Sequence, residues 1–163
     1  MLVWRNGKLL LIERKKPPFG FAPPAGHVDG RKSFEDAAQS ELQEEVGLCV
    51  KELELVAEGR RENPCRRENG TWHYWKVFHV SAFGEINASK CEVKRFIWCS
   101  AEDLRALRRR TEDFLAGKIS QAEWEERPGL EPVWSEFLTE LHYFEDRAQA
   151  SEVVVASLQS GRP

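Results

Sequence analysis

Short apolar stretches separated by turn residues dominate the pattern along this chain. Two of them, Leu2–Trp4 and Leu9–Glu13, flank Asn6-Gly7, which suits a hairpin turn because both central positions tolerate a positive φ. Alternating, β-branched or aromatic stretches predict three more strands, at Leu48–Val56, Thr71–Phe83 and Glu92–Cys99, with the second of them buried. We expect the proline- and glycine-rich residues 16–30 to form a loop with one brief extended piece, and the polar residues 59–70 to form another.

Helices are predicted between and after these strands. The first runs from a capping residue, Ser33, to a stop at Gly47. A second begins at Ser100, a short third begins at Ser120, and an amphipathic last helix spans Val133–Phe144. Because helices and strands interleave and hairpins occur among the strands, we expect an α/β fold with a mixed β-sheet between helices. Residues 1–145 are expected to form one domain, and residues 146–163 a C-terminal tail that can be partly disordered.

Composition narrows the class of protein. The chain has 163 residues, of which 41% are hydrophobic and 31% are charged, and its net charge is −3. These values predict a globular protein that attracts neither nucleic acid nor membranes. The four cysteines form no CxxC pair, and Arg5 and Lys8 interrupt any secretory signal. We therefore expect a cytoplasmic protein with reduced thiols.

The first helix carries an unusual density of acids. Between Ser33 and Val46 there are five carboxylates and no Lys or Arg. Glu41, Glu44 and Glu45 stand at i, i+3 and i+4, so one helical turn brings them together, at a cost of roughly 0.2–0.5 kcal/mol per pair on a solvated helix. A divalent cation would remove this repulsion, and hard oxygen ligands suit Mg²⁺ or Mn²⁺. The alternative is a solvated acidic face without a metal.

The segment Gly26–Leu48 resembles the Nudix box, whose pattern is G-x5-E-x7-R-E-U-x-E-E-x-G-U with U a bulky aliphatic residue. Seven of the nine specified positions match, namely Gly26, Glu41, Leu42, Glu44, Glu45, Gly47 and Leu48. Pro24-Ala25-Gly26 resembles the family's approach to the box, and Glu92–Trp98 resembles an E-x5-W stretch that leads into its last strand and helix. The resemblance covers residues 2 to about 144 and implies the family's α/β/α sandwich.

The resemblance also implies a reaction and roles for individual residues. The reaction is hydrolysis of a phosphoanhydride bond in a nucleoside diphosphate linked to another moiety, a class that includes nucleoside triphosphates, ADP-ribose and dinucleoside polyphosphates. Glu41, Glu44 and Glu45 would bind Mg²⁺ or Mn²⁺ with the backbone carbonyl of Ala25, and one of these glutamates, or Glu92, would take a proton from water. Gly26 would let the loop approach the substrate closely.

Two positions depart from the family pattern. Its first Glu is Lys32 here, and its Arg is Ser40, which leaves the three acids without the cation that braces them. Lys32 or Arg31 could return that charge from the loop. The departures keep two other hypotheses open. One is a catalytically weak or inactive Nudix-like module that binds a nucleotide or regulates a partner. The other is an interaction protein whose acidic helix contacts a basic partner.

Weaker signals surround this helix. The loop arginines Arg60, Arg61, Arg66 and Arg67 suit contacts to a diphosphate, with a solvated loop as the alternative. The aromatic residues Trp72, Tyr74, Phe19 and Phe21 are candidates for stacking on a base, with a place in the core as the alternative. The histidines His27, His73 and His79 are candidates for acid–base or supporting roles. A homodimer is left open, because the apolar last helix and the tail could contribute to one.

Overall fold

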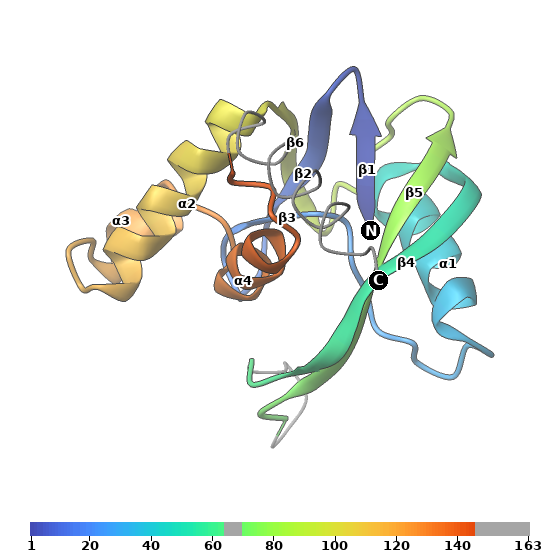
Figure 1. The fold of residues 1–163 in the computed structure, drawn as a ribbon, viewed down its shortest axis with the longest axis horizontal. Coiled ribbons are helices and arrows are strands. Elements are labelled where there is room, and N and C mark those ends of the chain that lie inside the picture. Colours follow the sequence, from blue (N-terminus) through green and yellow to red (C-terminus); the bar gives the residue numbers. More distant parts are fainter. Residues whose placement is uncertain (64–69, 146–163) are drawn as a thin grey trace, which may run out of the picture.

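The computed structural model describes residues 1–63 and 70–145, and within them strands and helices interleave as the sequence pattern predicts. The strands are β1 (Leu2–Arg5), β2 (Lys8–Arg14), β3 (Phe21–Ala22), β4 (Cys49–Arg61), β5 (His73–Phe83) and β6 (Val93–Cys99). The helices are α1 (Phe34–Val46), α2 (Ala101–Leu115), α3 (Gln121–Glu126) and α4 (Pro132–Glu140). Figure 1 shows α1 on one side of the sheet and α2 and α4 on the other. The expected α/β sandwich is therefore confirmed.

Strand β2 organises the sheet because it pairs with three other strands. It runs antiparallel to β1 and β3, which follow one another along one of its edges, and antiparallel to β6 along its other edge. Beyond β1, the order continues through β5, which is parallel to β1, to β4, which is antiparallel to β5. The parallel pair among antiparallel ones makes the sheet mixed, as predicted.

The apolar residues of β2 alternate between two hydrophobic cores. Leu9 and Leu11 belong to the core that α4 covers with Trp134. Leu10 and Ile12 belong to the core that α1 covers. Successive side chains of a strand point to opposite faces, so an unbroken apolar run is what a strand buried on both faces requires. This central strand fixes the sheet between the two helical layers.

Helix α1 begins and ends at the predicted residues. The hydroxyl of Ser33 accepts a hydrogen bond from the backbone N–H of Asp36 at 3.0 Å. Gly47 takes a left-handed conformation with φ of 75°, and its N–H donates to the carbonyl of Gln43. These two caps set the register of the helix and so the positions of its acids relative to the sheet.

Strands β4 and β5 form a longer hairpin than the sequence predicts, and its far end extends beyond the rest of the sheet (Figure 1). The predicted loop from Gly59 begins as strand, because residues 59–61 pair with residues 73–75 of β5. No residue of β4 is fully buried, so pairing with β5 and not an apolar pattern determines its length. The expectation that residues 71–83 form a buried strand is also wrong in part, since only Val77, Phe78 and Val80 are buried.

The C-terminal part differs in one boundary. Helix α4 ends at Glu140, whereas the amphipathic pattern predicts a helix to Phe144. Tyr143 and Phe144 still pack against the core that α4 covers, so their apolar character reflects burial of a turn. The tail, residues 146–163, lies outside the described residues. No helix among the described residues has the length and apolar character needed to cross a bilayer.

Candidate active site

The loop between β3 and α1 lies directly against the acidic side of the helix. A Cβ atom added to Gly26 would stand 1.9 Å from Cδ of Glu41 and 2.1 Å from its Oε2. Such distances lie far inside van der Waals contact, so any side chain at residue 26 would displace this carboxylate. Gly26 therefore allows the loop backbone to approach the carboxylate of Glu41 closely, which a side chain would push aside.

Glu45 is the buried acid of this helix. Its residue exposure is only 6%, and its Oε2 accepts a hydrogen bond from the backbone N–H of Ala25 at 2.8 Å. Burial raises the pKa of Glu45 to about 8, although the Ala25 hydrogen bond and the charge of Arg14 act to lower it. A buried carboxyl with such a pKa is typical of functional sites, where a ligand offsets the cost of burial.

Arg31 supplies the cation that the sequence pattern lacks inside the helix. Its guanidinium reaches Oε1 of Glu41 at 3.0 Å and Oε1 of Glu44 at 3.1 Å, and it also donates to the carbonyl of His27 at 3.0 Å. Burial raises the pKa of Glu41 above its ordinary value, and Arg31 opposes this shift. The hypothesis that Arg31 could return the missing charge is thus confirmed, while Lys32 is exposed to solvent.

A cavity of about 360 Å³ collects the predicted centre of the site. Its lining includes Ala25, Gly26, Glu41, Glu44, Glu45 and Glu92. Glu92 belongs to the turn before β6, and its negative charge acts to raise the pKa of both Glu41 and Glu45. Residues far apart in the sequence therefore meet at one cavity wall, which is rich in carboxylates.

The donor chemistry of this wall fits a divalent cation. Carboxylate oxygens are the ligands that Mg²⁺ and Mn²⁺ prefer, and a bound cation would favour the charged form of Glu45, which burial disfavours. Among residues 1–63 and 70–145, no three Asp, Glu, His or Cys side chains already converge closely enough to hold an ion. The guanidinium of Arg31 engages one oxygen each of Glu41 and Glu44.

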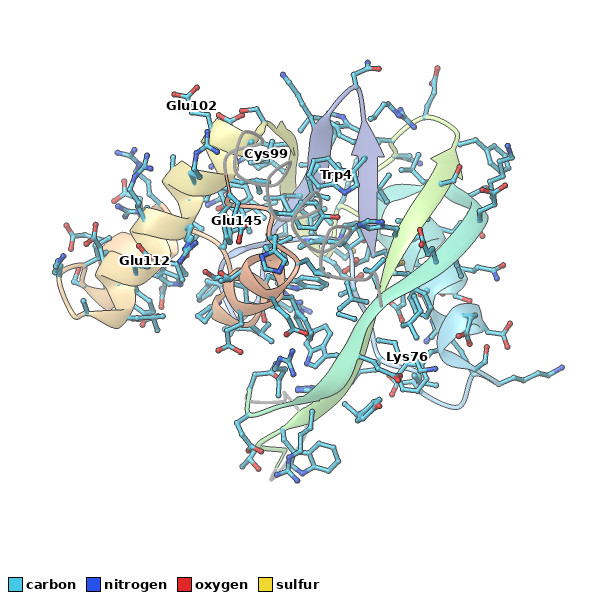
Figure 2. All side chains as sticks on the ribbon, viewed as in Figure 1. Trp4, Lys76, Cys99, Glu102, Glu112 and Glu145 are labelled. Atoms are coloured by element: carbon cyan, nitrogen blue, oxygen red, sulfur yellow. The ribbon has the colours of Figure 1, made fainter. Side chains whose placement is uncertain are left out.

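Of the predicted stacking residues, Tyr74 lines the cavity. The residue is 49% exposed, and its ring meets the ring of Phe34 edge-on, with centroids 6.3 Å apart. Lys76 also lines this wall and reaches from β5 toward the start of α1, where its Nζ lies 5.2 Å from the centroid of the Phe34 ring (Figure 2). Aromatic surface and positive charge thus lie beside the acids.

The structure places the other predicted substrate contacts elsewhere. The guanidinium of Arg60 lies over the ring of Trp72 at 4.5 Å, and neither residue lines the cavity. Arg61 pairs with Glu140 of α4 at 2.5 Å. Arg66, the remaining predicted contact, lies outside the described residues together with Arg67.

Two histidines, His27 and His73, meet at the cavity. Nε2 of His27 lies 3.3 Å from Nε2 of His73, and Nδ1 of His73 lies 3.1 Å from the carbonyl oxygen of Asn63. A carbonyl only accepts, so Nδ1 of His73 donates to Asn63, and Nε2 of His73 stays free to meet His27. The pair ties the β3–α1 loop to the start of β5.

Among the cavity-lining residues that the sequence pattern did not identify are Arg14, Trp75, Glu131 and Trp134. Arg14 is the last residue of β2 and follows the predicted end of the apolar strand by one residue. A charged residue directly after a buried strand could have indicated that Arg14 lines a site. Glu131 lies between the Pro128-Gly129 turn and the last helix. Polar residues are common in such a connection, so its sequence position gives no indication that it lines the cavity.

Comparison with known proteins identifies the family. A family model described as the NUDIX domain matches residues 1–121. The ADP-ribose pyrophosphatase of Methanocaldococcus jannaschii is 37% identical to this chain over 71 residues, which are 42% of this chain and 41% of that protein. The matched segment thus spans about two fifths of the relative's length.

Solved structures share the fold. A NUDIX hydrolase from Nitrosomonas europaea has a TM-score of 0.61 at 18% identity, and the match covers 86% of this chain and 84% of that one. The MutT NUDIX hydrolase from Burkholderia pseudomallei has a TM-score of 0.54 at 24% identity, with 62% of this chain and 79% of that one covered. With the family model matching well over half of its residues, this chain belongs to the Nudix family.

Proposed function

We propose that this chain is a pyrophosphohydrolase that uses Mg²⁺ or Mn²⁺ to cleave a phosphoanhydride bond in a nucleoside diphosphate linked to another moiety. The observation that carries this proposal is the carboxylate wall of the cavity. Glu41, Glu44 and Glu45 come from one helical turn, and Glu92 lies at the same cavity. A buried acid whose pKa rises to about 8 beside two more carboxylates is costly unless a ligand uses it.

In this proposal the wall holds the metal. Glu41, Glu44, Glu45 and the carbonyl of Ala25 are the ligands, and a bound divalent ion would neutralise charge on the phosphate oxygens and acidify water. Arg31 holds two of these acids together before a metal binds, because its guanidinium bridges Glu41 and Glu44. The hydrogen bond from the N–H of Ala25 fixes the direction of the Glu45 carboxyl.

Glu92 is the proton acceptor that this arrangement favours. It is exposed to solvent, lies on a turn and not on the metal-binding helix, and faces the same cavity. Arg14 provides positive charge on the cavity wall, where it can orient a phosphate group as a fork of donors. Positioning and charge compensation, rather than a covalent step, then account for the rate gain.

A screen of diphosphate compounds tests the proposal. Nucleoside triphosphates, ADP-ribose and dinucleoside polyphosphates are supplied with Mg²⁺ or Mn²⁺, and the released nucleotide is quantified. ADP-ribose is included because the Methanocaldococcus jannaschii relative is named as an ADP-ribose pyrophosphatase. We expect hydrolysis of at least one compound, and a loss on the order of 100-fold or more in kcat for Glu45→Gln.

The matched control is Glu35→Gln, which removes an exposed acid from the first turn of the same helix. This variant is expected to keep full activity. The proposal fails if folded protein hydrolyses none of the compounds with either metal, or if Glu45→Gln retains the rate of the unmodified protein.

The bridge from Arg31 to Glu41 and Glu44 favours a second candidate function, a nucleotide-binding module without turnover. In this function the guanidinium replaces the metal permanently, and the cavity binds a ligand that it does not cleave. Titration of the protein with Mg²⁺ or Mn²⁺ separates the two functions. Metal binding that disappears in Glu45→Gln supports the hydrolase, whereas nucleotide binding that is independent of metal and of this substitution supports the module.

A further inference from the structure

A second pocket, apart from the carboxylate wall, is lined mainly by cations. Its volume is about 360 Å³, and its charged lining residues are Lys15, Lys90, Lys94 and Arg95. Among the described residues, those that complete its lining are apolar and none is an acid. Because the whole chain carries a net charge of −3, this positive charge is a local feature and not a property of the composition.

Two of the four cations are held in place by a buried acid. Glu13 is only 2% exposed, and its two oxygens accept hydrogen bonds from Nζ of Lys94 at 2.7 Å and Nε of Arg95 at 2.5 Å. The side chains of Lys94 and Arg95 are nevertheless 49% and 59% exposed, so both can meet a ligand. Within the part of the chain that the structure describes, the terminal nitrogens of Arg95 make no hydrogen bond, which leaves their donors to an anion.

The other two cations come together without an acid. The ammonium of Lys15 donates to the backbone carbonyl of Lys90, which holds it at the turn before β6. Within residues 1–63 and 70–145, no carboxylate pairs with either lysine. Four positive charges thus line one pocket against the single negative charge of Glu13, an excess of three. Such crowding of like charges is unfavourable, and a bound anion would relieve it.

The pocket adjoins the active-site cavity through two segments of the chain. Arg14 and Lys16 line the cavity, whereas Lys15 between them lines the pocket. In the same way Glu92 lines the cavity and Val93 the pocket, and the backbone N–H of Lys15 donates to the carbonyl of Glu92 at 2.9 Å. The end of β2 and the start of β6 therefore separate two hollows that both carry cations.

We propose that this pocket is a binding site for an oligophosphate chain, that is, for three or more directly linked phosphate groups. The inference does not depend on the proposed reaction, because the pocket lies apart from the carboxylate wall. Lysine offers a point charge and arginine a fork of donors, and both suit phosphate oxygens. Linked phosphates concentrate several negative charges in one hollow, whereas nucleic acid spreads its charges along the backbone, one per nucleotide.

Inorganic tripolyphosphate is the probe that tests this site. Calorimetry measures its dissociation constant with protein dialysed free of divalent metal. We expect one site per chain, with an affinity that falls as sodium chloride is raised from about 50 to about 200 mM, because salt screens exposed charges. The double variant Lys15→Gln, Lys90→Gln should weaken binding about tenfold, since two charged contacts are lost. Both lysines are exposed, and thermal unfolding checks that the variant is folded.

The matched control is the double variant Lys8→Gln, Lys51→Gln, which removes two exposed lysines that do not line the pocket. It changes the net charge by the same amount and should alter the dissociation constant by less than about twofold. Lys16→Gln removes the neighbouring cation, whose side chain lines the cavity instead. This variant should also keep the affinity for tripolyphosphate within about twofold.

Adenosine 5′-tetraphosphate distinguishes the two sources of such a phosphate chain. If Lys16→Gln weakens its binding as strongly as the pocket double variant does, the pocket holds the far end of a molecule that begins in the cavity. If only the pocket double variant weakens its binding, the pocket takes the oligophosphate by itself. Either result supports the site.

Several results would overturn the proposal. These are no binding of tripolyphosphate at millimolar concentration, equal losses in the pocket double variant and its lysine control, and a loss in Lys16→Gln alone. Equally tight binding of a glutamate-rich peptide or of single-stranded DNA would also overturn it, because the pocket would then be a general anionic contact. None of these measurements involves hydrolysis, so this proposal and the proposed function fail separately.

Discussion

At the level of single residues, burial of Glu45 makes the stability of the metal-free protein depend on pH. Its pKa in the folded protein, about 8, lies above the ordinary value of 4.5. The folded state therefore binds a proton that the unfolded state has lost between these values. The stabilisation is complete below about pH 4.5 and is lost as the pH rises through 8.

We predict that the unfolding free energy, measured by urea titration in chelator, falls between pH 5 and pH 8 by roughly 2–4 kcal/mol through this group alone. Glu45→Gln should lack this part of the decline, since an amide does not titrate and its oxygen can still accept from Ala25. Glu35→Gln, on the exposed side of the same helix, should follow the unmodified protein. Parallel pH profiles for all three proteins would contradict the prediction.

The residue scale also shows what the sequence could and could not predict about the site. Helical periodicity is enough to bring Glu41, Glu44 and Glu45 onto one turn, because a helix has a fixed geometry. It says nothing about Arg31, which lies in a loop whose path depends on contacts such as its bond to the carbonyl of His27. Glu131 escapes prediction for the same reason, since a contact with β3 positions it.

At the level of elements, the C-terminal cap of α1 joins the acidic helix to the rest of the fold. Gly47 has φ of 75°, and a Cβ atom there would stand 3.0 Å from Cβ of Asn87. Gly30, before the helix, has φ of 80° but nothing within 4 Å of the added atom. Both glycines have a positive φ, but a side chain would meet another residue only at Gly47. Comparing alanine substitutions at the two positions therefore separates the cost of backbone strain from the cost of a steric clash.

We predict that Gly30→Ala lowers the unfolding free energy by about 1 kcal/mol, the cost of a left-handed backbone for alanine. Gly47→Ala should cost about 1 kcal/mol more than this, because the segment at Asn87 must also move. Denaturant midpoints of the two variants give the difference directly. Equal losses would mean that Asn87 yields without cost and that strain alone explains the glycine.

The elements that the sequence predicted well are those with a buried stripe or a cap. Strand β2 and helix α1 have both apolar patterns and clear ends. The far part of β4 has neither, because its residues 59–61 are polar and gain their structure from pairing with β5. Such non-local pairing leaves no periodic mark on the sequence, and the predicted loop was too long as a result.

At the scale of the whole molecule, the β4–β5 hairpin is tied to the helical layer that carries Glu131. Arg61 of β4 places its guanidinium 4.4 Å from the centroid of the Phe137 ring and pairs with Glu140, both residues of α4. Arg60, its neighbour, pairs instead with Glu62 at 2.7 Å near the same end of the hairpin. Two adjacent arginines thus face different parts of the molecule. A homodimer, to which the apolar last helix and the tail could contribute, stays a prediction.

We predict that Arg61→Ala lowers the unfolding free energy by about 1–2 kcal/mol, because it removes a cation–π contact and an ion pair between two layers. Arg60→Ala removes an exposed ion pair with Glu62 and an exposed cation–π contact with Trp72, both within the same hairpin, and should cost less, no more than about 1 kcal/mol. Urea titration of both variants measures this difference, and their KM values against a hydrolysed compound test the alternative. If Arg61→Ala keeps full stability but raises KM, the arginine contacts substrate, as the sequence pattern first indicated, and its place against α4 is secondary.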